Sequence, residues 1–270
     1  MAKKKFEELN LKDAFLFGAV LEDPETCRLV LEVVLGRSVE GITVHAEHTL
    51  FYSSDYRSIR LDIYAEDDER KHYNVEMQGE NKGNLPKRSR FHQADMDVTN
   101  LNQGEDFDSL PPSYVIFICA FDPFDQGLYR YTFENRCLER DFPLEDGAIK
   151  VFLSTKGKNA DQVPAELVNF LRYVEESTNE CVQIMNDEVV YRLHERVTSL
   201  KRSKKWRKQY MRFEELLQDA EKQGREEGCE ETQKRLCVLI ARMTEAGEAD
   251  RLSMLSDADF LNEMFLKYQI

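Results

Sequence analysis

Two neighbouring extended segments place acidic side chains where they could act together. The segment RLDIY contains Asp62, and the segment NVEMQ contains Glu76 and Gln78. Because side chains alternate between the faces of a strand, the polar residues of each segment share one face and the apolar residues share the other. With a turn centred near Glu69, antiparallel pairing predicts that Asp62 lies directly opposite Glu76, at a separation of about 5.5 Å.

Facing carboxylates suggest a metal site, because like charges opposite one another are destabilising without a compensating cation. Hard divalent ions prefer carboxylate, carbonyl and water oxygens. We therefore expect Asp62 and Glu76 to bind Mg²⁺ or Mn²⁺, with the main-chain carbonyl of Met77 as a further ligand. The amide of Gln78 would orient the attacking water or a phosphate. This chemistry is metal-assisted attack on a phosphodiester; the alternative is an exposed hairpin face with scattered charges.

The elements around this hairpin alternate between helices and strands. A helix is predicted over residues 24–35. Asp23 can cap its first turn, Pro24 suits the first helical position, and Gly36 can end it. β-branched and aromatic runs predict strands, and helical periodicity with terminal signals predicts further helices. The predicted strands are 42–52, 57–66, 71–79, 113–121, 128–137 and 149–155, and the predicted helices include 86–104 and 164–176. This order predicts an α/β fold with a mixed sheet of five or six strands flanked by helices.

The composition is that of a folded chain without a membrane segment. Hydrophobic residues make up 41% of the 270 residues, which is enough to form a core. No apolar run approaches the roughly 20 residues that span a bilayer, and the first residues lack the pattern of a signal peptide. We expect a cytoplasmic protein. Its six cysteines show no C-x-x-C pair, which favours reduced thiols over a zinc or redox motif.

Basic residues cluster directly after the acidic hairpin. Lys82, Lys87, Arg88 and Arg90 surround the predicted start of a helix, where backbone amides also favour anions. They form either a clamp on a nucleic-acid backbone or an ordinary solvated helix start.

A second basic run lies within an acidic chain. The net charge is −14, yet residues 196–213 contain eight Lys or Arg and no acid. Lys204, Lys205 and Arg207 from this run would contact DNA, with Trp206 and Tyr210 stacking on bases or lying along the backbone. In the other interpretation, the run pairs with the acidic segment that follows it.

The C-terminal region is predicted to be a charged helical appendage. We place a boundary near Thr178, which gives a domain with the predicted sheet over 1–178 and a helical region over 179–270. Only Gly224 and Gly228 interrupt the helical pattern between about 182 and 246, and Ser256 is a candidate cap for a last helix. A stripe at helical spacing favours packing or homodimerisation, and it consists of Leu236, Leu239, Ile240 and Met243.

The order of elements and several segments resemble the PD-(D/E)XK nuclease superfamily, and specifically the Rpn-type group of recombination-promoting nucleases or putative transposases. The resemblance covers roughly residues 6–176, and the segment GREEGCEE resembles the charged tails of that group. Its landmarks are LKDAFLFGAVLEDPETCRLVLEVVLG, SIRLDIYAED, YNVEMQ, KRSRFHQADMD, YVIFICAFDPF, YTFENRC and DGAIKVFLSTKG.

The resemblance implies a restriction-endonuclease-like fold and a Mg²⁺-dependent DNA endonuclease associated with recombination or mobile elements. Asp62 matches the first motif acid, Glu76 the second, and Gln78 the position where most of the superfamily has lysine. Glutamine carries no charge, so stabilisation of the transition state must come from the metal or from a base at another position. Lys12 belongs to a Lys-Asp pair of the same resemblance, with either a structural or a ligand-binding role.

Two other classes of function remain open from the sequence. One is a DNA-binding or assembly module that has this fold with little or no cleavage. The other is a structural interaction protein in which the hairpin face is ordinary surface. Cleavage assays separate the first alternative from the endonuclease, and salt-dependent retention on DNA argues against the second.

Overall fold

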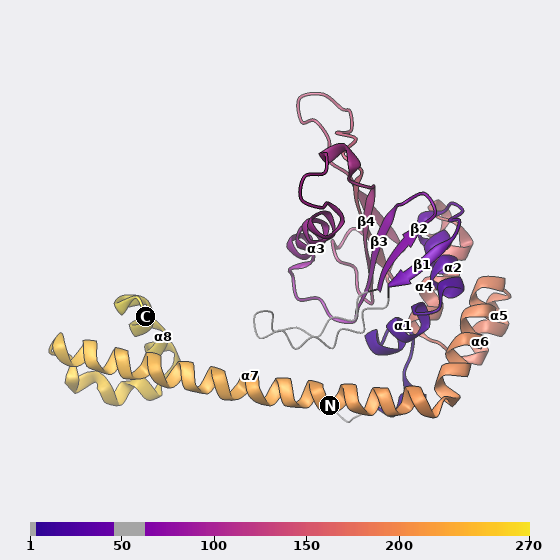
Figure 1. The fold of residues 1–270 in the computed structure, drawn as a ribbon. Helices are drawn as coiled ribbons and strands as arrows, with labels where there is room; N and C mark the ends of the chain where they lie inside the picture. The colour runs from indigo at the N-terminus through magenta and orange to yellow at the C-terminus, as the bar shows by residue number, and fades with distance from the viewer. Residues whose placement is uncertain (1–3, 46–62) are drawn as a thin grey trace. The chain divides into compact units, whose positions relative to one another are not determined.

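The computed structural model describes residues 4–45 and 63–270, and it contains two compact units, Met1–Tyr210 and Met211–Ile270 (Figure 1). Within the described part of the first unit, six strands form one mixed sheet in the order β1-β2-β3-β4-β6-β5. The predicted α/β sheet is therefore confirmed at six strands. The strands are β1 (Ile42–His45), β2 (Ile63–Asp67), β3 (His72–Gln78), β4 (Ser113–Cys119), β5 (Arg130–Phe133) and β6 (Ala148–Ser154).

The β2–β3 hairpin has the register that a turn centred near Glu69 predicts. Ile63 pairs with Val75 and Tyr64 with Asn74 in an antiparallel ladder. Asp67 fixes the turn, because its carboxylate accepts hydrogen bonds from the backbone amides of Glu69 at 3.0 Å and Lys71 at 2.8 Å. The remainder of the two predicted strands 42–52 and 57–66 lies outside the described residues.

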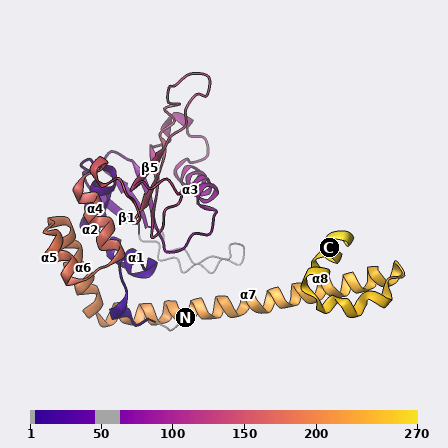
Figure 2. The same cartoon turned by 180° about the vertical axis from the view of Figure 1, so that it is seen from behind.

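Helices cover both faces of the sheet. In Figures 1 and 2, α3 lies on one face, and α1, α2 and α4 lie on the other. The helix α2 begins and ends as predicted, because the Asp23 carboxylate accepts from the Thr26 amide and Gly36 adopts a left-handed conformation with φ 68°. The helices are α1 (Ala14–Leu21), α2 (Pro24–Leu35), α3 (Leu85–Asn100), α4 (Ala165–Glu175), α5 (Asn179–Met185), α6 (Glu188–Arg202), α7 (Lys204–Glu245) and α8 (Ala258–Tyr268).

The two faces of the sheet differ in polarity. The face covered by α1, α2 and α4 is apolar, and Val75 and Met77 of β3 are buried there. The face beneath α3 is half apolar, with Phe117 and Phe152 stacked at its centre. Its other half consists of the polar side chains of β2 and β3. Since α3 covers both halves, polar groups are buried beside an aromatic core.

The helices after Thr178 divide between the two units. The helix α6 buries Val190, Leu193 and Val197 and contacts α1, α2 and α4 of the first unit. The predicted domain boundary near Thr178 stays a prediction, while the compact units divide after Tyr210.

Two expectations for the C-terminal helices are wrong. The helix α7 continues through Gly224 and Gly228, since single glycines cost a helix only about 1 kcal/mol each. Asp257, and not Ser256, caps α8, because its carboxylate accepts hydrogen bonds from the amides of Asp259 and Phe260. No helix in the described residues is both long and apolar enough to cross a bilayer.

The second unit has its own small core. Leu239 and Met243 of α7 are fully buried against Phe260 and Met264 of α8. Half of the predicted apolar stripe is thus used within the unit, while Ile240 stays 38% exposed. Homodimerisation through these helices stays a prediction.

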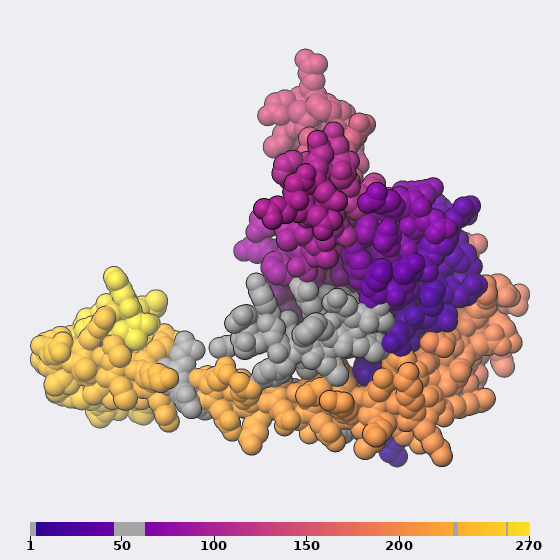
Figure 3. Space-filling model, in the orientation of Figure 1, coloured from indigo at the N-terminus to yellow at the C-terminus, as the bar shows by residue number. Residues whose placement is uncertain are grey.

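The connection from β5 to β6 projects from the sheet (Figures 1 and 3). It is an extension of the strand pair, in which Arg136 pairs with Pro143. Leu138 in this extension is almost fully exposed, at 97%. Arg136 in this extension forms ion pairs with Glu134 and Asp141.

Glu175 at the end of α4 ties the N-terminal segment to the sheet. Its carboxylate accepts hydrogen bonds from Lys12 at 2.7 Å, and from Lys156 and Thr155 at 3.0 Å each. Burial raises the pKa of Glu175, but the hydrogen bonds from Lys12, Lys156 and Thr155 outweigh it and lower the pKa to about 2. Lys12 therefore links the N-terminal segment to the end of α4, and a role in ligand binding stays a prediction.

We expect Glu175→Gln to lower the free energy of unfolding at pH 7 by about 1 kcal/mol, because solvent screens a partly exposed ion pair. The pKa of Glu175 is lowered from 4.5 to about 2 on folding, so the stabilisation is complete above pH 4.5 and disappears as the pH falls through 2. Urea denaturation at pH 7, 4 and 2.5 measures this trend. The exposed neighbour Glu176→Gln is the control, and an effect of Glu175→Gln that is equal at all three pH values contradicts the prediction.

Candidate functional site

Glu76 is a buried acid on the polar half of the sheet face that α3 covers. Glu76 lies on β3, opposite Phe117 of β4, and is 7% exposed beneath α3. Asn74, two residues earlier on the same face, is also 7% exposed. The alternative of an exposed hairpin face is therefore wrong for β3. A carboxylate in such a position needs a counter-charge and hydrogen bonds, because burial of an unpaired charge is costly.

Arg88 of α3 provides that counter-charge. Its guanidinium donates to Glu76 Oε1 through Nη2 and to Gln78 Oε1 through Nη1, the latter at 3.0 Å. The Gln78 amide in turn donates to Glu76 Oε1 at 2.6 Å. Glu76, Gln78 and Arg88 thus form a hydrogen-bonded network, the Glu76 network, at the carboxyl end of β3.

The same network contains a second residue of α3. His92 Nε2 lies 3.5 Å from Glu76 Oε2. Arg88 and His92 are four residues apart, so they occupy the same face of the helix one turn apart. His92 was not among the site residues predicted from the sequence. Its spacing from Arg88, on the helix that follows the Glu-x-Gln strand, is the signal that would have found it.

The predicted metal ligands are only partly described. Asp62 lies outside the described residues, directly before Ile63, while Glu76 and Met77 are placed at the end of β3. The Gln78 amide lies 3.2 Å from the main-chain oxygen of Met77. Within residues 4–45 and 63–270, no three His, Cys, Asp or Glu side chains converge as a metal cluster.

The donor chemistry at the end of β3 fits a hard divalent ion. A buried carboxylate, a main-chain carbonyl and a glutamine amide oxygen are the oxygen ligands that Mg²⁺ accepts. The Arg88 guanidinium, however, already contacts Glu76 Oε1. Since the Gln78 amide also donates to Oε1, an ion at this oxygen would displace one of these two donors.

The other basic residues at the start of α3 are oriented differently. Lys87 and Arg90 are exposed on the first turns of the helix, and Lys82 is exposed in the loop before it. They lie near the Glu76 network in sequence, and their exposure suits either of the two predicted roles. Of the predicted cluster, Arg88 is the member that contacts the acid.

The three residues of the second basic run that were predicted to contact DNA differ in their surroundings. Lys204 and Lys205 are exposed at the start of α7, with the Lys205 ammonium 5.7 Å from the centre of the Trp206 ring. Arg207 forms an ion pair with Glu7.

The aromatic residues of that run are part of the core. Trp206 and Tyr210 are each 7% exposed. The Tyr210 ring packs on Phe6 and Phe15, with centroid distances of 5.6 and 5.2 Å, and Trp206 packs edge-on against Phe15 at 6.2 Å. Because these rings hold the N-terminal segment, the expectation that they stack on bases is wrong.

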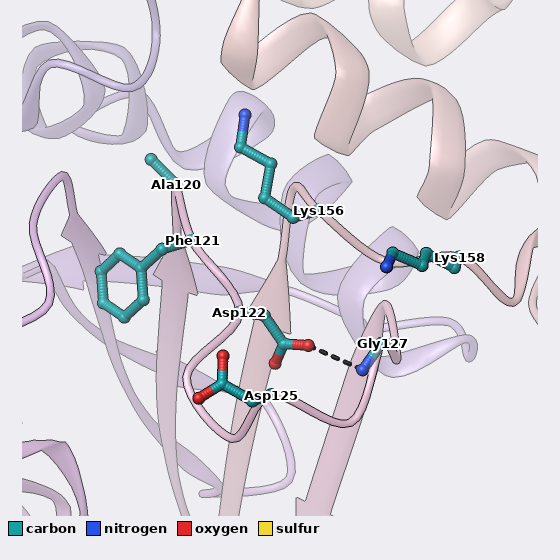
Figure 4. A pocket seen from close by; sticks show the side chains of 7 residues that line it. All are labelled: Ala120, Phe121, Asp122, Asp125, Gly127, Lys156 and Lys158. Atoms are coloured by element: carbon teal, nitrogen blue, oxygen red, sulfur yellow. Dashed lines mark hydrogen bonds between the residues drawn. The ribbon is translucent and has the colours of Figure 1, made fainter.

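A separate pocket of about 370 Å³ opens where β4 and β6 end (Figure 4). Asp122 beside it accepts hydrogen bonds from Tyr131 at 2.6 Å and from the Gly127 amide at 2.7 Å. Burial raises the pKa of Asp122, but these hydrogen bonds lower it overall. The pocket is lined by two acids, Asp122 and Asp125, and by two bases, Lys156 and Lys158, of which Lys156 pairs with Glu175. Glu76 is not among the residues that line the pocket.

Comparison with known proteins identifies a family. A family model described as PD-(D/E)XK nuclease family transposase matches residues 16–227. This range contains all six strands of the sheet and the Glu76 network. No curated protein and no solved structure matched the chain. Since the model covers well over half of the sequence, the chain belongs to the PD-(D/E)XK nuclease family transposases.

Proposed function

We propose that this protein is a Mg²⁺-dependent DNA endonuclease that hydrolyses phosphodiester bonds in recombination or in the movement of a genetic element. The observation that supports it most is the position of Glu76, buried at the carboxyl end of β3 within a hairpin whose register pairs Ile63 with Val75. The same turn centre, near Glu69, underlies the prediction from the sequence that pairs Asp62 with Glu76; Asp62 itself lies outside the described residues. Membership in a nuclease family supports the same reaction.

In this proposal, Asp62, Glu76 and the main-chain carbonyl of Met77 hold the ion. A bound divalent ion lowers the pKa of a water molecule and stabilises negative charge on the phosphate. The Gln78 amide hydrogen-bonds the water or a phosphate oxygen, a role that needs orientation and no charge. Burial beneath α3 excludes bulk water from the carboxylate, which strengthens its interactions with cations.

The test is nicking of supercoiled plasmid by purified wild-type protein and by Asp62→Ala, in Mg²⁺ and in Mn²⁺. We expect wild-type protein to nick the plasmid and the variant to lose this activity. Glu69→Gln, which changes an exposed acid of the same hairpin, is the control and should retain it. Equal nicking by wild-type protein and Asp62→Ala would mean a contaminating nuclease and would contradict the proposal.

A DNA-binding or assembly module with weak or no cleavage is the second candidate. It is favoured by Gln78 at the position of the superfamily's lysine and by the contact of Arg88 with Glu76. Under this alternative, wild-type protein and Asp62→Ala bind DNA equally, and wild-type protein nicks it weakly or not at all.

Exposed bases at the start of α3 would contact the DNA backbone. We expect the double substitution Lys87→Gln with Arg90→Gln to weaken DNA binding and to reduce the slope of log K against log salt concentration by about 2, because each lost phosphate contact removes about 0.9. Fluorescence anisotropy with a labelled duplex between 50 and 200 mM salt measures the slope. Lys222→Gln, in the second unit, is the control, and an unchanged slope for the double variant contradicts the backbone clamp.

A further inference from the structure

Arg88 has contacts that a surface arginine does not have. It bridges Glu76 and Gln78, and its guanidinium carbon lies 5.6 Å from the centre of the Phe117 ring. The Glu76 side chain is 9% exposed, whereas the Arg88 side chain is 31% exposed. The guanidinium therefore sits between a buried acid and the solvent.

Two cations would compete for one carboxylate. The proposed divalent ion needs Glu76, and Arg88 already contacts Glu76 Oε1. A guanidinium and a divalent ion within a few ångströms of one another repel strongly at a site of low dielectric. Binding of the ion would therefore displace Arg88 from the acid.

The displaced guanidinium would have a nearby partner in the DNA substrate. Arg88 lies on the first turns of α3, next to the exposed Lys87 and Arg90, at a helix start that favours anions. A guanidinium binds phosphate with two parallel hydrogen bonds and keeps its charge at any pH relevant here. It would add the positive charge that Gln78 lacks.

We propose that Arg88 is an exchangeable counter-charge that neutralises Glu76 in the ion-free protein and binds a DNA phosphate once a divalent ion has taken its place. The inference rests on the proposed function and deepens it. One consequence is that ion binding and DNA binding strengthen each other, since each removes the contact that opposes the other.

The test compares wild-type protein with Arg88→Gln in two assays that do not depend on cleavage. Isothermal titration calorimetry with Ca²⁺ measures ion affinity without DNA, and anisotropy of a labelled duplex measures DNA affinity in Ca²⁺ and in EDTA. We expect Arg88→Gln to bind Ca²⁺ about tenfold more tightly than wild-type protein, because no guanidinium competes. We also expect Ca²⁺ to strengthen DNA binding by about tenfold in wild-type protein and by much less in the variant.

Two matched variants complete the experiment. Arg88→Lys keeps the positive charge and should bind Ca²⁺ nearly as wild-type protein does. If Arg88→Gln folds poorly, the effect of Ca²⁺ on DNA binding by wild-type protein decides, and no strengthening would overturn the proposal. Arg172→Gln removes an exposed arginine of α4, outside the proposed ion and DNA sites, and should leave Ca²⁺ affinity unchanged. A tenfold gain in Arg172→Gln as well would mean a general charge effect and would overturn the proposal.

The possible failures are distinguishable. Equal Ca²⁺ affinity of wild-type protein, Arg88→Gln and Arg88→Lys would overturn the exchange of Arg88 and leave the metal-dependent nuclease intact. Absence of Ca²⁺ binding in every one of these proteins would overturn both the exchange and the metal site of the proposed function.

Discussion

Replacement of Glu76 by glutamine is expected to lower the rate of plasmid cleavage by about 10³-fold, because loss of a metal ligand removes several kcal/mol of transition-state stabilisation. Glutamine has the same size as glutamate and retains one acceptor oxygen for Arg88. The partly exposed Arg88 can also reach water, so the fold should tolerate the change. Single-turnover cleavage with saturating protein and Mg²⁺ measures the effect on the chemical step.

A matched control separates the loss of a metal ligand from the loss of any negative charge near the site. Glu80 follows the end of β3 and is exposed, so Glu80→Gln should cleave at the wild-type rate. Circular dichroism and urea denaturation of Glu76→Gln establish that the variant is folded. A folded Glu76→Gln that cleaves within tenfold of wild-type protein would show that this carboxylate does not hold the ion.

Replacement of Phe117 by alanine is expected to lower the free energy of unfolding by about 3–5 kcal/mol. Phe117 is fully buried on the central strand β4 and stacks on Phe152, with ring centroids 5.4 Å apart and planes at 10°. Its removal leaves a cavity beneath α3 and also removes the ring on which Arg88 packs. Urea denaturation at neutral pH measures the loss.

An exposed phenylalanine provides the comparison for this substitution. Phe107 is 78% exposed, so Phe107→Ala should change the free energy of unfolding by no more than about 0.5 kcal/mol. Similar costs for Phe107→Ala and Phe117→Ala would contradict the placement of Phe117 in the core.

Local patterns in the sequence were sufficient for most of the fold. The helix over 24–35 follows from Asp23 and Gly36, which satisfy the end groups of the helix wherever it packs. The β2–β3 register follows from the alternation of polar and apolar residues, because a shift by one residue would turn Val75 toward α3. The choice of Asp62 and Glu76 as metal ligands came from this pattern and the family resemblance, and it stays a prediction.

Tertiary packing decided which charges meet. The parallel connection from β3 through α3 to β4 brings Arg88 and His92 over Glu76, and neither contact follows from strand alternation. Packing also buried Trp206 against the N-terminal segment. Backbone periodicity and helix ends depend on neighbours in sequence, whereas the counter-charge of a buried acid depends on the element that covers it. Here that element is α3, which packs on this face because doing so buries the face as a whole. No short stretch of sequence determines this packing.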